Sequence, residues 1–458
     1  MHLSKNRFAA VVIIALCIST GLLAFFYFGV LQSIYRKSAT GEDAYTKQTE
    51  MLLREVSGKI VQVRELSPPQ NIPLKVVTLD WVEENWGRKS AEESSEELQV
   101  EEEIYKALFL IPQNLSLAEV MVEQAGATMA AVSEGNLYVV REHFNPFDKL
   151  SAERTLAHEV THMMQEKYFK NPDVRFHDEL QAWAALIEGD AGFTADKYIE
   201  ETTSRPAISD GAAFLSSNKL SVATHLSTVK MPGSLIELWL FQYRYGESFV
   251  STLYKAGGWE RVNAAYANPP ITTEEILHPE KYLEGESFVQ VNSTSLNSSD
   301  WNPVKTERFG EHFILVMLSS HIPRDYAIKA AEGWRGDNFT YYKKGEDYLF
   351  TWKIVWDTER DSAEFFDSFV QMMDAVDARQ ILPSCRCASN NTIMWKAGNQ
   401  YVSLIRNQSS AVVSGSTGLN WYQLNLYTGS PIMLLATSTI LCDTSKPLLR
   451  IRLVAIIA

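Results

Sequence analysis

The sequence predicts an α+β protein of two or three domains that begins with a hydrophobic segment. Residues 151–164 and 178–198 repeat apolar side chains at helical spacing. Shorter runs rich in β-branched and aromatic residues, such as 348–355, are typical of strands. The chain has 458 residues and a net charge of −14, which makes nucleic acid and anionic lipid surfaces unfavourable partners.

The hydrophobic segment, residues 8–30, contains no charged side chain. It is longer than the roughly 20 residues that cross a bilayer as a helix. A cleaved secretory signal has an apolar core of roughly 7 to 15 residues, and no small-x-small cleavage site follows this segment. We therefore predict a signal anchor over residues 1–37. The very short N-terminal tail favours a single-pass membrane protein with its folded part outside the cytosol.

The elements that follow are short. Before residue 130 we expect, in order, a helix over 44–66, a strand over 74–79 and a helix over 102–110. The acidic run 92–103 is most simply a solvated loop and helix start. In the segment TMAAVSEGNLYVVRE, Glu134, Gly135 and Asn136 predict a turn, and 137–140 predicts the second strand of a hairpin.

Residues 158–162 form the pentapeptide His158-Glu159-Val160-Thr161-His162. Residues four apart share one face of a helix, so both imidazoles can bind one zinc ion while Glu159 lies beside them. The composition of the chain gives roughly 0.02 expected matches by chance, so coincidence explains the motif poorly. The alternative is a purely structural helix without a metal.

The surroundings of the motif favour a helix. Ser151 is a plausible N-cap, and Glu153 and Arg154 follow it in the first turn. An apolar stripe at helical spacing would bury one side of this helix; it consists of Leu156, Val160, Met163 and Met164. We interpret both methionines as core residues.

Glu188 is the best candidate for a third zinc ligand. It lies in a helix predicted over 178–198, where its neighbours are apolar and an unpaired charge would be costly. A glutamate paired with a cation elsewhere is the alternative. Glu179 could replace it as a ligand, although the helix dipole alone explains an acid there. Asp178 and Asp190 could hydrogen-bond a ligating histidine on its other nitrogen.

HEVTHMMQ followed by ALIEGDA resembles the HExxH…EGxA pattern of gluzincins, the thermolysin-like zinc metallopeptidases, and especially their peptidase-MA-like branch. The resemblance implies a zincin-like domain, here over 38–288, with a small mixed sheet, active-site helices and a helical subdomain. It implies zinc binding by His158, His162 and Glu188, with Glu159 as the general base. It also implies an edge strand before the active helix, along which a peptide or protein substrate lies in extended form.

Such enzymes usually need one more group to stabilise the oxyanion. The candidates are Tyr243, Tyr245 and His278. Core packing is the alternative role for either tyrosine in this aromatic-rich segment. His278 precedes Pro279 and could instead cap a turn. Segments such as FQYRYGESFV and RFGEHFIL also resemble those of membrane-anchored HExxH surface proteins of prokaryotes.

The C-terminal part predicts a small α+β unit over 304–409, after a Ser- and Asn-rich linker at 289–303. Its expected elements are helices over 307–320 and 361–376 and strands at 341–342, 348–355, 392–396 and 401–405. Residues 410–458 give no clear pattern. Beyond the hydrophobic segment only Cys385, Cys387 and Cys442 remain, which permits at most one intrachain disulfide.

Two functions are consistent with these features. The first is a membrane-anchored, extracytosolic zinc metallopeptidase that hydrolyses peptide bonds through metal-activated water and Glu159. The second is a surface binding or assembly protein built on an inactive or repurposed peptidase scaffold. The large non-catalytic part and the lack of an evident oxyanion residue motivate the second.

Overall fold

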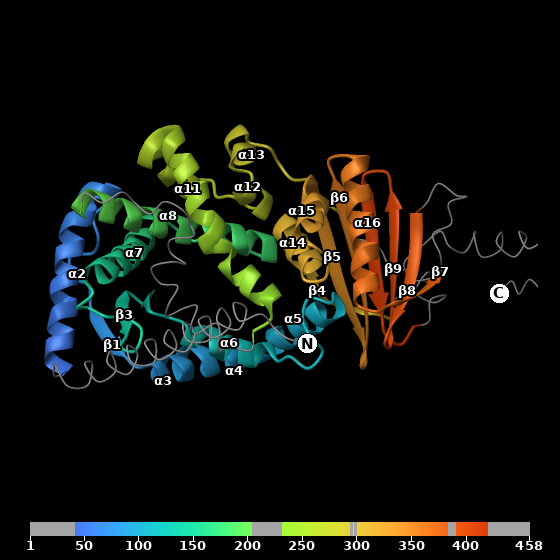
Figure 1. Cartoon of the computed structure of the whole chain (residues 1–458), viewed down its shortest axis with the longest axis horizontal. Coiled ribbons are helices and arrows are strands. Elements are labelled where there is room, and N and C mark those ends of the chain that lie inside the picture. Colours follow the sequence, from blue (N-terminus) through green and yellow to red (C-terminus); the bar gives the residue numbers. More distant parts are fainter. Residues whose placement is uncertain (1–41, 204–230, 294–295, 297–299, 383–390, 420–458) are drawn as a thin grey trace, which may run out of the picture.

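The structure, a computed structural model, describes residues 42–203, 231–293, 296, 300–382 and 391–419. It is an α+β protein with two separate sheets. The three-stranded sheet and its helices lie at one end of the molecule, and the seven-stranded sheet lies at the other (Figure 1). The cysteines named above lie outside the described residues.

The structure corrects the prediction of a single-pass membrane protein. Among the described residues, none of the helices combines the length and apolar character needed to cross a bilayer. The longest of them, α11 (Gly233–Ala267), carries charged side chains such as Glu237, Arg244 and Glu247 along its length. The predicted segment 8–30 lies outside the described residues. The structure therefore does not support the predicted membrane anchor or the extracytosolic location.

The small sheet contains β1 (Leu74–Val77), β2 (Ala130–Ser133) and β3 (Asn136–Val140) in the order β1-β3-β2. The sheet is mixed, because β1 runs parallel and β2 antiparallel to the central β3. Glu134 and Gly135 both have positive φ, as the tight turn of a two-residue hairpin requires. The predicted hairpin is confirmed, and its first strand is an edge of the sheet.

Two helices beside this sheet carry the candidate zinc ligands. α7 (Lys149–Tyr168) contains the HExxH motif, and α8 (His177–Thr203) contains Glu188. The N-cap of α7 is Asp148, whose carboxylate accepts from the Ser151 amide, so the predicted cap at Ser151 was three residues late. One core joins α7 to the sheet and to α2 (Glu42–Arg64) and includes Ile60, Leu137, Val139, Leu156, Val160 and Met164.

The remaining helices of this half are α3 (Leu79–Val82), the π-helix η1 (Glu83–Arg88), α4 (Lys89–Glu93), α5 (Ser95–Ala107), α6 (Leu117–Gly126), α12 (Thr273–Leu277) and α13 (Pro279–Glu284). The helices from α3 to α6 form a row that leads from the small sheet toward the large one, whereas α12 and α13 lie beside α11 (Figure 1). The sequence predicts an irregular segment where α12 and α13 lie. A capping box between Thr272 and Glu275 starts α12 there, because each side chain accepts from the other residue's backbone amide.

The large sheet is antiparallel, with strand order β4-β5-β6-β10-β9-β8-β7. Its strands are β4 (Asn302–Glu307), β5 (Trp334–Lys344), β6 (Asp347–Trp356), β7 (Arg379–Leu382), β8 (Asn391–Ala397), β9 (Gln400–Asn407) and β10 (Ser410–Ser416). Alternate residues of β6, namely Phe350, Trp352, Ile354 and Trp356, belong to the main core. The helices α14 (Gly310–Ser319), α15 (Arg324–Ala331) and α16 (Glu359–Ala375) pack in that core, and α5, α6 and α11 also contribute buried residues to it.

A buried polar junction joins the two halves. The Arg308 guanidinium Nε lies 3.0 Å from the carboxylate of Asp178 at the start of α8, and both side chains are almost fully buried. Gly310 has φ +80°, and a Cβ there would lie 1.9 Å from the Asp178 carboxylate. The backbone amides of Phe309 and Gly310 donate to Asp337 on β5. Glycine is therefore required where α14 begins against α8.

Candidate metal centre

His158, His162 and Glu188 come together in the structure as the sequence predicts. His158 Nε2 lies 3.1 Å from His162 Nε2 and 3.1 Å from Glu188 Oε2. His162 Nε2 lies 3.6 Å from the same Glu188 oxygen. Among the described residues, these three form the one group of at least three metal-binding side chains with mutually close ligand atoms.

The spacing of the three ligand atoms fits zinc. Tetrahedral zinc with Zn–N and Zn–O bonds near 2.0–2.2 Å places its ligand atoms about 3.3–3.5 Å apart. The three observed separations, 3.1, 3.1 and 3.6 Å, lie around this value. Two nitrogens and one carboxylate oxygen are a typical catalytic zinc set, which leaves the fourth position open.

The side chains of the triad shift one another's pKa values. Burial alone lowers the pKa of His162, but the Glu188 carboxylate outweighs burial and raises it to about 10. Burial raises the pKa of Glu188, but the two imidazoles outweigh it and hold that pKa well below its usual range. The Glu188 carboxylate is thus ionised and able to bind a cation.

Glu188 is positioned by an unusually close contact between α8 and α11. A Cβ at Gly189, the next residue, would lie 2.2 Å from the carbonyl oxygen of Gly246. A Cβ at Gly246 would lie 2.2 Å from the carbonyl oxygen of Ala185. Both glycines are therefore needed for the two helix backbones to touch. This contact brings α11 against the face of α8 that carries the ligand.

A cavity of about 130 Å³ opens beside the triad, between β2, α7 and α11. His158, Glu159 and Tyr243 line it together with Ala130 of the edge strand. Its other lining residues are Ala127, Thr128, Met129, Arg154, Thr155, Trp239 and Leu240. The residue expected to act as general base and one oxyanion candidate therefore face the same space as a candidate zinc ligand.

Glu159 and Tyr243 have perturbed pKa values in this cavity. Burial raises the pKa of Glu159, against the lowering effect of His158 and His162. Its Oε2 is buried and has no hydrogen-bond partner among the described residues. Burial and the carboxylates of Glu188 and Glu159 raise the pKa of Tyr243 well above its usual value. The Tyr243 phenol is therefore protonated and able to donate.

The other two oxyanion candidates lie elsewhere. The Tyr245 ring packs against Phe241 and His312, with centroids 5.3 and 6.0 Å away, and its hydroxyl accepts from Arg324. His278 connects α12 to α13, and its Nε2 lies 3.1 Å from Glu311 Oε1. Neither residue lines the cavity beside the triad.

The other acidic candidates, Glu179 and Asp178, bind partners outside the triad. The Glu179 carboxylate accepts from the Arg175 amide and from Arg308, so it is not near the triad. Asp178 binds Arg308 and Thr273 rather than a histidine. These acids belong to the junction between the two halves.

The sequence interpretation missed Gln165, which contacts a candidate zinc ligand directly. His162 Nδ1 lies 2.8 Å from Gln165 Oε1, and Gln165 Nε2 donates to Asp190 Oδ2 at 3.2 Å. The predicted hydrogen bond from Asp190 to a ligating histidine is therefore wrong, because Gln165 lies between Asp190 and His162. The spacing of three residues after His162 was the available signal, because such residues share a helix face.

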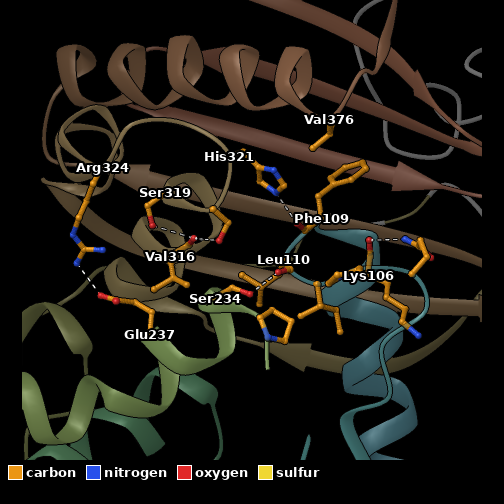
Figure 2. Close-up of a pocket in the computed structure, with 16 residues that line it drawn as sticks. Lys106, Phe109, Leu110, Ser234, Glu237, Val316, Ser319, His321, Arg324 and Val376 are labelled. Carbon is orange, nitrogen blue, oxygen red and sulfur yellow. Dashed lines mark hydrogen bonds and ion pairs between the residues drawn. The ribbon is translucent and has the colours of Figure 1, made fainter. Parts of the chain in front are cut away.

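A larger cavity, about 600 Å³, lies away from the triad between the end of α5, the start of α11 and α14 (Figure 2). His321 Nε2 lies 2.7 Å from the carbonyl oxygen of Phe109, and the Ser234 hydroxyl donates to the carbonyl of Leu110. Arg324 pairs with Glu237 across the cavity wall, as Figure 2 shows. Its polar groups thus bind one another and do not converge on a reacting centre.

Comparison with known families matches residues 300–418 to a domain of unknown function, DUF8575. The match covers the large sheet with α14, α15 and α16, and ends just beyond β10. No curated protein and no solved structure matches the chain. The matched residues do not include the half that carries the triad.

Proposed function

We propose that the chain is a zinc-dependent metallopeptidase of the gluzincin type, with Glu159 as its general base. The observation that carries this proposal is the spacing of His158, His162 and Glu188, whose ligand atoms lie 3.1–3.6 Å apart, close to the separations around tetrahedral zinc. The cavity shared by His158, Glu159 and Tyr243 supports hydrolysis rather than a purely structural metal.

Zinc bound there would supply Lewis-acid polarisation of a scissile carbonyl and would acidify water. The Glu159 carboxylate takes a proton from the attacking water and passes it to the amide nitrogen that leaves. The raised pKa of Glu159 suits this proton transfer, because a carboxylate whose pKa is closer to neutral pH can both accept and release the proton. The protonated Tyr243 phenol donates to the carbonyl oxygen as negative charge develops on it.

The edge strand supports an extended peptide as the substrate. In the part of the chain that the structure describes, β2 pairs only with β3, so its outer backbone groups have no strand partner. Ala130 begins β2 and lines the cavity beside Glu159. A peptide paired along β2 would run past the triad, with backbone hydrogen bonds providing affinity.

The test uses the purified full-length protein and two matched variants on α7. Glu159→Gln should retain one zinc per chain by elemental analysis and lose cleavage of a broad peptide library by about 10²–10⁴-fold. Glu166→Gln makes the same change at an exposed position of the same helix and should leave cleavage intact. A well-folded protein without zinc, prepared so that metal is retained, would refute the proposal.

The binding or assembly function makes a different prediction in the same experiment. A protein of that class would hold zinc but cleave nothing in the library, and Glu159→Gln would change neither property. Cleavage that Glu159→Gln abolishes would exclude it, because hydrolysis needs a base at this position and scaffolding does not.

A further inference from the structure

We propose that Gln165 is a positioning residue that fixes the metal-binding tautomer of His162, and that Asp190 sets the orientation of the Gln165 amide. The proposal rests on the proposed zinc site. It assigns a role to a buried polar network behind the triad, formed by Arg64, Gln165, Asp190 and Tyr266.

The orientation of the Gln165 amide follows from its neighbours. Its Nε2 lies 3.0 Å from the carbonyl oxygen of Ile187 and 3.2 Å from Asp190 Oδ2. A carbonyl and a carboxylate only accept hydrogen bonds, so the NH₂ end of the amide must face them. The amide oxygen is then left to face His162.

Asp190 is itself held as a hydrogen-bond acceptor. Arg64 donates to both of its carboxylate oxygens, at 2.8 and 3.1 Å, and the Tyr266 hydroxyl donates at 2.7 Å. The Arg64 and Asp190 side chains are both fully buried. Because the guanidinium supplies only donors, Asp190 cannot present a donor to Gln165 without losing this pairing.

The amide oxygen of Gln165 determines which His162 nitrogen carries the proton. Gln165 Oε1 lies 2.8 Å from His162 Nδ1 and only accepts, so Nδ1 must donate. His162 Nε2 therefore keeps its lone pair in the neutral ring, and this nitrogen faces His158 and Glu188. A reversed amide would favour the other tautomer and block the nitrogen that binds the metal.

In this arrangement the Asp190 carboxylate is linked to the His162 imidazole through the Gln165 amide and not by a direct hydrogen bond. Ligating histidines commonly donate directly to a carboxylate, which raises their basicity as well as orienting them. Here a neutral amide provides orientation, and the charge of Asp190 is matched by Arg64. The network also joins four helices, because Arg64 ends α2, Gln165 belongs to α7, Asp190 to α8 and Tyr266 to α11.

The experiment measures zinc affinity of the full-length protein by chelator competition. Gln165→Met keeps the size of the side chain but removes its hydrogen bonds to His162, Ile187 and Asp190. It should weaken zinc binding by about 10–100-fold. Gln181→Met is the matched control on α8, where the same change lies outside the network and should leave affinity unchanged. Equal affinities of wild type and Gln165→Met would overturn the proposal.

Gln165→Glu separates positioning from a purely structural role. It keeps an acceptor oxygen for His162 but puts a second carboxylate beside Asp190, so it should unfold at a lower temperature than Gln165→Met and yet bind zinc more tightly. An affinity ranking that instead follows unfolding temperature would overturn the proposal. In Co²⁺-loaded wild type, a slowly exchanging, paramagnetically shifted ring N–H of His162 is expected, and it should exchange faster in Gln165→Met.

Failure of the zinc proposal is distinguishable in the same experiment. A wild-type chain that binds neither Zn²⁺ nor Co²⁺ refutes the metal site and, with it, the role of Gln165. A wild-type chain that binds zinc as tightly as its Gln165→Met variant refutes the role of Gln165 alone.

Discussion

Replacing Gly246 by alanine tests whether the contact between α8 and α11 positions the catalytic cavity. The added Cβ would lie 2.2 Å from the carbonyl oxygen of Ala185. Because ordinary carbon contacts begin near 3.5 Å, the two helices must separate by about 1 Å. The carbonyl is backbone within a helix and cannot move aside as a flexible side chain would.

Two effects of Gly246→Ala have opposite signs. Overpacking of this kind costs about 1–3 kcal/mol, whereas glycine to alanine inside a helix gains about 0.5–1 kcal/mol. We therefore expect a net loss of stability of about 1–2 kcal/mol. Gly58→Ala on α2 isolates the helix-propensity gain, because nothing lies within 4 Å of a Cβ at that position. Gly58→Ala should stabilise the protein.

The separation should affect turnover more than metal binding. Tyr243 belongs to α11, whereas all three ligands belong to α7 and α8. A displacement of about 1 Å near the reacting atoms can cost about 10²-fold in rate. Thermal unfolding, zinc affinity and peptide cleavage should be measured for Gly246→Ala and Gly58→Ala in parallel. Equal stabilisation of both variants, with unchanged turnover, would refute the reasoning.

Three further predictions concern the cavity, the metal and acid stability. Tyr243→Phe should lower peptide turnover by about 10²–10³-fold, while Tyr245→Phe should have little effect; equal losses would contradict the assignment. Zinc at 100 times its Kd should add about 2.7 kcal/mol to the free energy of unfolding, and chelation should remove it in calorimetry; an unchanged unfolding transition would contradict a native zinc site. Burial lowers the pKa of His177 to about 4 and that of His312 well below its usual range. In the folded protein both pKa values lie below the unfolded value near 6.5, so these histidines take up protons more readily in the unfolded chain. Their contribution to the free energy of unfolding is therefore complete above pH 6.5 and is lost as the pH falls below it. His177 contributes about 1.4 kcal/mol per pH unit between pH 6.5 and 4, and His312 acts in the same direction below pH 6.5. His312→Leu should make the fall in stability below pH 6.5 less steep in denaturant titrations; an unchanged slope would argue against a neutral, buried His312.

The candidate zinc ligands could be identified from the sequence because each is marked by a local physical constraint. His158 and His162 are four residues apart, so any helix places them on one face. Glu188 stood out because an ionised side chain among apolar neighbours needs a partner. The structure places its carboxylate 3.1 Å from His158. None of these inferences required knowledge of how distant segments pack.

The choice between the two tyrosines could not be made in this way. Tyr243 and Tyr245 are two residues apart, so they lie on nearly opposite faces of α11. Which face meets the triad depends on the contact at Gly246, a feature of two helices far apart in the sequence. Gln165 was missed for a related reason, because its role depends on Ile187 and Asp190 of another helix.

Strand β10 was missed because its sequence, SAVVSGS, gives a weak alternation. In the structure it lies between β6 and β9, so it is internal rather than an edge. Its small residues make room for its neighbours: a Cβ at Gly415 would lie 2.3 Å from the Phe350 ring of β6. Here packing requires the very residues whose intrinsic strand preference is low.

The junction at Arg308 makes the C-terminal unit part of the architecture that positions the metal centre. The matched domain of unknown function begins at residue 300, just before β4 leads into Arg308. Arg308 binds Asp178 at the beginning of α8, and Glu188 lies further along the same helix. Breaking a buried pair of this kind costs about 3–5 kcal/mol, because the remaining charge stays buried without compensation. A rigid helix anchored at its first turn cannot change its tilt independently, so the C-terminal unit constrains the position of Glu188 even though it contributes no ligand.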